Sequence, residues 1–160
     1  LAQNLPCHIL GLDSSTQTIE IGRESLPKDL EKRVELLSYD FSHVRDKYDV
    51  IFTANLYHLL TPDSRIKLRQ TVKRCLKAGG LLFLSALSVN DPEHFGKGTP
   101  VENETNSFLD ERYLHFSTRL EVEQAFDFLD VHALFEWEYR EESSTGTHHH
   151  VSWILMGKMR

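Results

Sequence analysis

The stretch HILGLDSSTQTIEIGRESL, residues 8–26, decides the fold class. A continuous apolar run predicts a buried strand over residues 7–13, which ends abruptly at Asp13. The capping-box spacing S-x-x-Q that begins at Ser14 predicts a helix over about residues 15–25. A buried strand followed directly by a helix is typical of an α/β protein with a parallel sheet.

The rest of the chain continues this alternation. Thr61-Pro62 starts a second helix, since a hydroxyl side chain precedes a proline, and Gly79-Gly80 ends it. A second capping box, Thr118 to Glu121, opens a third helix. The remaining predicted strands cover residues 33–39, 48–54, 81–88, 130–142 and 148–160.

The order of these elements predicts an α/β, Rossmann-like, mostly parallel sheet in one domain, residues 1–160. Between the last two strands lie only residues 143–147, so they form a C-terminal antiparallel hairpin. Residues 89–116 show no periodic pattern and are expected to form a long loop, and such loops are usually functional or mobile.

Composition excludes several classes of protein. The chain has 160 residues, of which 40% are hydrophobic and 26% charged, so it folds rather than staying disordered. A net charge of -6 disfavours a nucleic-acid partner. No apolar run approaches the roughly 20 residues of a membrane helix, and no signal-peptide pattern is present. Cys7 and Cys75 fit reduced, buried thiols, so a cytoplasmic location is expected.

Polar residues follow three of the predicted strands. Asp13, Asp40 and Asn55 would emerge at one edge if these strands are parallel, and ligands bind at that edge of an α/β sheet. A carboxylate there typically accepts the ribose hydroxyls of a nucleotide cofactor. Asp13 equally suits plain helix N-terminal chemistry, because an anion is favourable beside free N–H groups. Nor does a ribose-binding carboxylate separate nicotinamide enzymes from other nucleotide-binding proteins.

Three quoted segments occur in an order shared with a known family. HILGLDSSTQTIEIGRESL, VELLSYDF and YDVIFTANLYHLLTPDSRIKLRQTVKRCLKAGGLLFLSALS resemble the second to fifth strands, with their helices, of class I S-adenosylmethionine-dependent methyltransferases. The ending, YLHFSTRLEVEQAF followed by HHHVSWILMGK, is similar to the branch that includes tellurite-resistance and related small-molecule methyltransferases.

The resemblance implies a cofactor, S-adenosyl-L-methionine, and a role for each matching residue. Asp13 binds the ribose, Ser14 lines the adenine, Asp40 takes the adenine amino group, Phe41 flanks the ring and Asn55 lies near the methionine portion. The implied reaction is in-line methyl transfer to a small molecule, in which the enzyme aligns the reactants and excludes water.

Candidate residues for contact with the methyl acceptor lie after the strand predicted over residues 48–54 and in the second half of the chain. Tyr57 and His58 are candidates for contact with the acceptor and for catalysis, although packing at a loop–helix junction is the favoured explanation. His148 and His150 share one face of a strand and are expected, with His115, at the mouth of the substrate site. A polar strand start also explains them, and no metal site is expected.

The chain departs from the family at its N-terminus. The Gly-rich loop and the first strand of the family are absent, and LAQNL resembles the end of the family's first helix, so upstream residues are expected in the complete protein. Two alternatives stay open: an NAD-dependent oxidoreductase, and a non-catalytic methyltransferase-like binding or scaffold domain.

Overall fold

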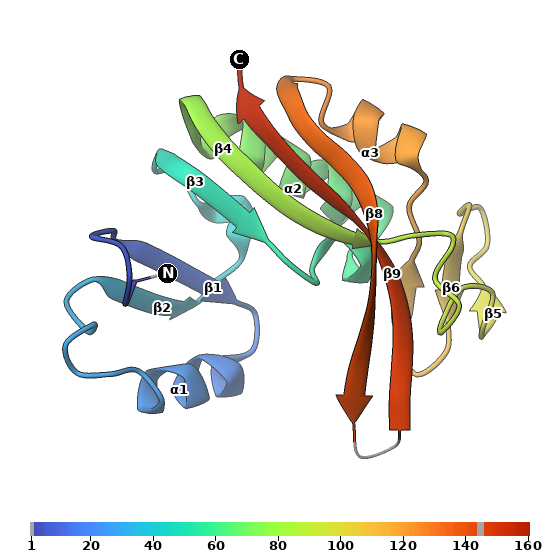
Figure 1. Ribbon diagram of the computed structural model, residues 1–160, viewed down its shortest axis with the longest axis horizontal. Coiled ribbons are helices and arrows are strands. Elements are labelled where there is room, and N and C mark those ends of the chain that lie inside the picture. Colours follow the sequence, from blue (N-terminus) through green and yellow to red (C-terminus); the bar gives the residue numbers. More distant parts are fainter. Residues whose placement is uncertain (1, 144–145) are drawn as a thin grey trace. The chain divides into compact units, whose positions relative to one another are not determined.

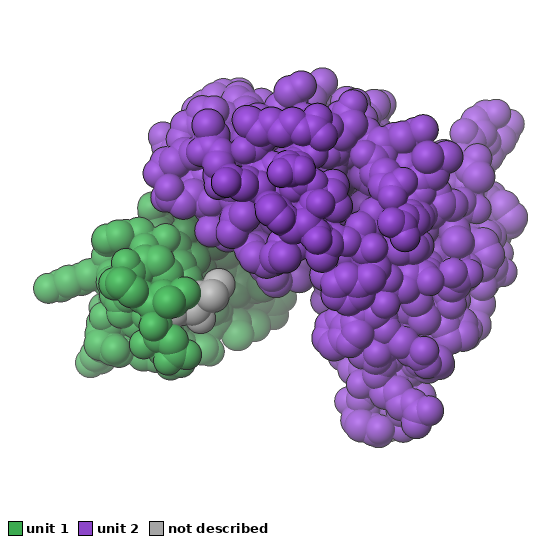
Figure 2. All heavy atoms as spheres, turned by 45° about the horizontal axis from the view of Figure 1, so that its top comes forward, with its two compact units in different colours: residues 1–44 green, residues 45–160 purple. Residues whose placement is uncertain are grey.

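The computed structural model describes residues 2–143 and 146–160, and the chain divides into two units, Leu1–Val44 and Arg45–Arg160. Figure 1 shows the elements of both units, and Figure 2 shows which atoms belong to each.

Unit 1 is built on two parallel strands and the helix that connects them. It contains β1 (Ile9–Asp13), α1 (Thr16–Glu24), β2 (Val34–Ser38) and the 3₁₀ helix η1 (Phe41–His43). The strand–helix–strand order confirms the prediction, but the cap is one residue later than expected. Ser15, not Ser14, is the N-cap, and its hydroxyl accepts a hydrogen bond from Thr18 N at 3.2 Å.

Unit 2 contains a four-stranded sheet whose order is β3-β4-β9-β8. The strands of this sheet are β3 (Tyr48–Thr53), β4 (Leu76–Leu87), β8 (Leu129–Ser143) and β9 (Gly146–Met159). Between β3 and β4 lie the 3₁₀ helix η2 (Tyr57–Leu59) and the helix α2 (Pro62–Cys75). Strands β3 and β4 are parallel, whereas β9 is antiparallel to both of its neighbours, β4 and β8. The C-terminal hairpin is therefore confirmed, but residues 144–145 of its connection lie outside the described residues.

The sheet of unit 2 is mixed, which corrects the expectation of a mostly parallel sheet. Only β1–β2 and β3–β4 are parallel pairs in the described part of the chain. The hairpin places β9 directly beside β4 (Figure 1), so the second half of this sheet is antiparallel. The sequence order indicated a hairpin but not that its second strand pairs with β4.

Gly79-Gly80 does not end α2, which is a further correction. The helix ends at Cys75, and β4 begins at Leu76, which pairs with Tyr48. The register then shifts, so the glycines lie in an irregular part of the strand; Gly79 has φ 77°. A Cβ on Gly80 would lie 2.9 Å from the carbonyl oxygen of Asp49. These glycines are therefore needed for a close strand approach rather than for a helix cap.

Residues 89–116 are not a plain loop. They contain a three-stranded antiparallel sheet made of β5 (Thr99–Pro100), β6 (Ser107–Leu109) and β7 (Tyr113–His115). Strands of two or three residues are too short to produce an alternating pattern, so sequence periodicity missed them. Phe116, which is fully buried, packs with Leu87 and Leu114 and anchors this small sheet to the end of β4.

The third helix is α3 (Arg119–Ala125), and its predicted cap is confirmed. Thr118 Oγ1 accepts a hydrogen bond from Glu121 N at 3.2 Å. At the other end of the chain, residues 2–4 form a turn rather than the expected end of a helix. Among the described residues, no helix is both long and apolar enough to span a membrane.

Candidate functional site

Two predicted cofactor-binding carboxylates lie at the same end of the sheet in unit 1. Asp13 is the last residue of β1 and is paired with Ser38, and Asp40 follows two residues after Ser38. Asp13 Oδ1 accepts a hydrogen bond from Ser15 N, and Asp40 Oδ1 accepts one from Ser42 N, both at 2.8 Å. Each carboxylate therefore supports a local turn at the carboxyl end of its strand.

The chemistry of this end of unit 1 fits a nucleoside. Within residues 2–143 and 146–160, Asp13 Oδ2 makes no hydrogen bond, so it keeps acceptor capacity for a hydroxyl group. Phe41 is half-buried directly after Asp40, and Ser14 is exposed directly after Asp13. Carboxylate acceptors beside an aromatic ring are the groups that a ribose and an adenine require.

Asn55 belongs to unit 2, after β3. Its φ is 52°, in the left-handed region, and its backbone N–H donates a hydrogen bond to Ser85 Oγ at 3.1 Å. Asparagine adopts this conformation more readily than most residues, which explains its place at the end of the strand. Its predicted meeting with Asp13 and Asp40 spans the two units and stays a prediction.

Tyr57 and His58 lie in η2 and are almost completely buried, with 3% and 8% of their surface exposed. Burial, followed by the positive charge of Arg112, lowers the pKa of His58 from 6.5 to about 4. His58 Nδ1 has no hydrogen-bond partner in the described part of the chain. Burial and the neighbouring Glu121 carboxylate raise the pKa of Tyr57. Neither side chain is a good base at neutral pH.

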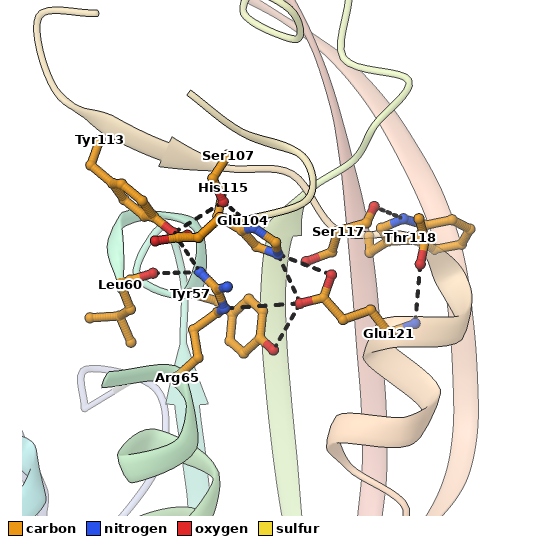
Figure 3. Close-up of polar contacts among 11 residues, drawn as sticks. Tyr57, Leu60, Arg65, Glu104, Ser107, Tyr113, His115, Ser117, Thr118 and Glu121 are labelled. Carbon is orange, nitrogen blue, oxygen red and sulfur yellow. Dashed lines mark hydrogen bonds and ion pairs between the residues drawn. The ribbon is translucent and has the colours of Figure 1, made fainter. Parts of the chain in front are cut away.

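His115, at the end of β7, lies in a polar network (Figure 3). His115 Nε2 is 2.8 and 3.0 Å from the two carboxylate oxygens of Glu121, and Nδ1 is 2.9 Å from Ser107 Oγ. An ionised carboxylate only accepts hydrogen bonds, so Nε2 carries the proton that faces Glu121. Tyr57 donates a further hydrogen bond to Glu121 Oε1 at 3.3 Å.

Arg65, in α2, connects this network to the small sheet. Its Nη1 donates to the Leu60 carbonyl at 2.7 Å and to the Tyr113 hydroxyl at 2.8 Å. The Tyr113 hydroxyl in turn donates to Glu104 Oε2 at 2.6 Å. Arg65 Nε lies 4.0 Å from Glu121 Oε1. One cation therefore lies between two carboxylates from different segments (Figure 3).

An open cavity of about 400 Å³ adjoins this network. The lining comes from the starts of α2 and α3, the turn before β6 and the end of β7. Its residues are Pro62, Arg65, Asn103, Glu104, Thr105, Asn106, His115, Thr118 and Glu121. Of these residues, sequence reasoning proposed only His115 for a site. Glu121 was noticed only as a capping residue, and Arg65 and Glu104 carry no local pattern that distinguishes them from ordinary surface charges.

His148 and His150 contact a different set of side chains. The buried Asp91 binds His150 Nδ1 at 3.3 Å, and Glu93 binds His148 Nδ1 at 3.3 Å. The rings of His148 and His150 stack at 6.3 Å, and His94 stacks on His150 at 5.4 Å. No group of three or more side chains suited to a metal ion occurs among the described residues.

A family model described as "Methyltransferase domain" matches residues 1–80, which is half of the chain. No curated protein matches the chain.

Solved structures of methyltransferases share the fold. An S-adenosylmethionine-dependent methyltransferase from Methanosarcina mazei has a TM-score of 0.76 at 17% identity, over 95% of this chain and 82% of that one. TehB from Haemophilus influenzae has a TM-score of 0.72 at 13% identity, over 98% of this chain and 51% of that one. The N-methyltransferase NodS from Bradyrhizobium japonicum, in complex with S-adenosyl-L-homocysteine, has a TM-score of 0.62 at 10% identity, over 95% and 66%.

Proposed function

The chain belongs to the methyltransferase domain family, and from this premise we propose that it transfers a methyl group from S-adenosylmethionine to a small-molecule acceptor. The observation that carries the proposal is the pair of carboxylates, Asp13 and Asp40, at the carboxyl end of the parallel strands β1 and β2. Ligands of α/β sheets bind at this end. Both residues lie within the matched stretch, residues 1–80.

The cofactor-binding roles are proposals for individual side chains. Asp13 accepts hydrogen bonds from the ribose hydroxyls through Oδ2, because Oδ1 already accepts the hydrogen bond from Ser15 N. Asp40 takes the adenine amino group, and Phe41 and Ser14 flank the base. Asn55 contacts the methionine portion through its backbone. NodS was solved with S-adenosyl-L-homocysteine, which supports a bound nucleoside of this kind in a similar fold.

When it is bound, S-adenosylmethionine supplies an electrophilic methyl group on a positively charged sulfur. The residues of this chain then bind, orient and exclude water, which is the main requirement for in-line transfer. Tyr57 and His58 suit a positioning role better than proton transfer. The lowered pKa of the buried His58 makes its imidazole a weak base, and the raised pKa of the buried Tyr57 keeps its hydroxyl protonated at neutral pH. His115 is the stronger candidate for the acceptor side because it lines the cavity beside Glu121, whereas His148 and His150 contact Glu93 and Asp91 elsewhere.

Calorimetric titration of the complete protein with S-adenosylmethionine and with NAD tests this proposal. We expect binding of S-adenosylmethionine only. Asp13→Asn should weaken that binding about 10- to 100-fold, because hydrogen bonds to a charged group contribute roughly 1.5–3 kcal/mol. Asparagine keeps an oxygen for Ser15 N but loses the second acceptor. Asp29→Asn, which changes an exposed carboxylate in the same unit, is the matched control and should bind normally.

Other results would replace the proposal. Tight binding of NAD without S-adenosylmethionine would indicate an oxidoreductase. Binding of neither would indicate a non-catalytic domain of this family. Unchanged affinity in Asp13→Asn would remove Asp13 from the ribose site.

A further inference from the structure

The cavity beside Glu121 lies at the end of the sheet where α/β proteins bind ligands. η2 follows the carboxyl end of β3, and Ser117 forms a parallel bridge with Ser88, the residue after β4. The bridge places the N-terminus of α3, and with it Glu121, beside the end of β4. Both parallel strands of unit 2 therefore point their carboxyl ends toward the elements that line the cavity.

Charges on the cavity wall favour a ligand that donates hydrogen bonds. The wall contains one cation, Arg65, and two carboxylates, Glu104 and Glu121. Arg65 is directed to a backbone carbonyl and to Tyr113, and only 12% of its side chain is exposed. Glu104 Oε1 accepts no hydrogen bond from another residue described in the structure. The described lining thus has two carboxylates and one arginine, and the arginine already donates hydrogen bonds to groups of the protein.

Glu121 is held in place for contact with a ligand. Its carboxylate is fixed by His115 and Tyr57, which are both almost completely buried, yet 29% of its side chain stays exposed. It also lines a second cavity of about 270 Å³ between α2 and α3. A carboxylate fixed by buried donors but open to solvent is preorganised for a charged partner.

We propose that this cavity binds the methyl acceptor and that the acceptor is an amine whose nitrogen is held by the Glu121 carboxylate. The inference rests on the proposed function and names its substrate class. An anionic acceptor is disfavoured, because it would face two carboxylates, whereas Arg65, the one arginine or lysine among the described lining residues, already binds protein groups.

The charge that moves during methyl transfer gives Glu121 a catalytic role. An acceptor bound as the ammonium first loses one proton to solvent. The lone pair of the resulting neutral amine then forms the new N–C bond, while the C–S bond of the sulfonium breaks and its electron pair stays on sulfur. The positive charge thereby moves from sulfur to nitrogen, and the methylated ammonium loses a proton to solvent afterwards. A carboxylate that hydrogen-bonds the nitrogen stabilises this charge as it develops. His115 and Tyr57 are positioning residues, because they act through Glu121.

Binding of three matched probes, without cofactor, tests the inference. 4-Fluorobenzylamine is a cation at pH 7, 4-fluorobenzyl alcohol is neutral and 4-fluorobenzoate is an anion, yet all three have the same ring. Their ¹⁹F NMR signals are followed as the complete protein is added. We expect the amine signal to shift and broaden, the alcohol signal to respond weakly and the benzoate signal not to respond.

Substitutions then assign the effect to the cavity. Glu121→Gln should weaken amine binding at least about 10-fold, since a charge-assisted contact is lost. Glu123→Gln removes an exposed carboxylate that pairs with Arg119 on the same helix, so it is the matched control and should bind the amine normally. If Glu121→Gln fails to fold by circular dichroism, Glu104→Gln provides the same test from another part of the wall.

Three results would overturn the inference: an amine signal that does not respond, a benzoate signal that responds as strongly as the amine signal, or amine binding that survives both Glu121→Gln and Glu104→Gln. Calorimetry with S-adenosylmethionine separates this failure from that of the proposed function. Cofactor binding without amine binding rejects the amine class alone. Amine binding without cofactor binding rejects methyl transfer, and with it the role of the amine as acceptor.

Discussion

The buried imidazole of His58 should make unit 2 less stable in mild acid. In the unfolded chain, His58 takes up a proton as the pH falls below about 6.5, whereas in the folded chain it stays neutral until about pH 4. The unfolded state therefore binds more protons in this window, and the free energy of unfolding falls as the pH falls. Each pKa unit corresponds to about 1.4 kcal/mol, so His58 alone should cost roughly 2–3 kcal/mol by pH 4.5.

Replacement of the imidazole by a neutral side chain of similar size isolates this effect. His58→Gln cannot be protonated, so the difference in unfolding free energy between wild type and variant should be constant above pH 7 and should fall by about 2–3 kcal/mol towards pH 4.5. Urea unfolding followed by tryptophan fluorescence measures it. Both tryptophans of the chain, Trp137 and Trp153, lie in unit 2 with His58, so the signal reports on the relevant unit.

His132→Gln is the control, because it removes an exposed histidine from β8 of the same unit. It accounts for the loss of one histidine without a change in the buried site. A difference curve for His58→Gln that is flat between pH 7 and 4.5, or that matches the curve for His132→Gln, would refute the reasoning.

Two further substitutions test the packing of residues 89–116. Asp91→Ala should lower the free energy of unfolding by about 2–5 kcal/mol in urea unfolding. The Asp91 carboxylate is only 2% exposed and accepts hydrogen bonds from His94 N at 2.8 Å and Val151 N at 2.9 Å, which the variant leaves without a partner. A change below about 1 kcal/mol would contradict this reasoning. Phe116→Ala should lower the free energy of unfolding by about 3–5 kcal/mol in the same assay, because the ring is fully buried and packs against the rings of Phe95 and Phe108. An unchanged urea midpoint would show that Phe116 does not anchor the small sheet.

Elements with a clear local signal, such as an apolar run or a capping residue, were predicted well. The strands that became β1, β2 and β3 and the terminal hairpin are confirmed, as is α3 with its Thr118 cap. The family was also predicted correctly, because strand, acid and helix recur at its spacing within residues 1–80. Local sequence specifies these features, since each depends on neighbouring residues only.

Features that depend on distant partners were missed. Gly79-Gly80 has the appearance of a helix end, but the carbonyl of Asp49 on the neighbouring strand explains Gly80. Glu121 has the appearance of a cap, but its contacts with His115 and Tyr57 exist only once α3, β7 and η2 have packed. No pattern within one segment shows which side chains from other segments will meet it.

The position of β9 determines when the sheet of unit 2 can be completed during protein synthesis. This strand, Gly146–Met159, is the last in sequence order, yet it lies between β4 and β8. As the chain emerges from the ribosome, β4 keeps one unpaired edge until these residues appear, and β8 has nothing to pair with. Such an edge is open to pairing with other nascent chains. Truncation of the chain before residue 146 should therefore promote aggregation, whereas the chain that includes β9 should not aggregate in this way.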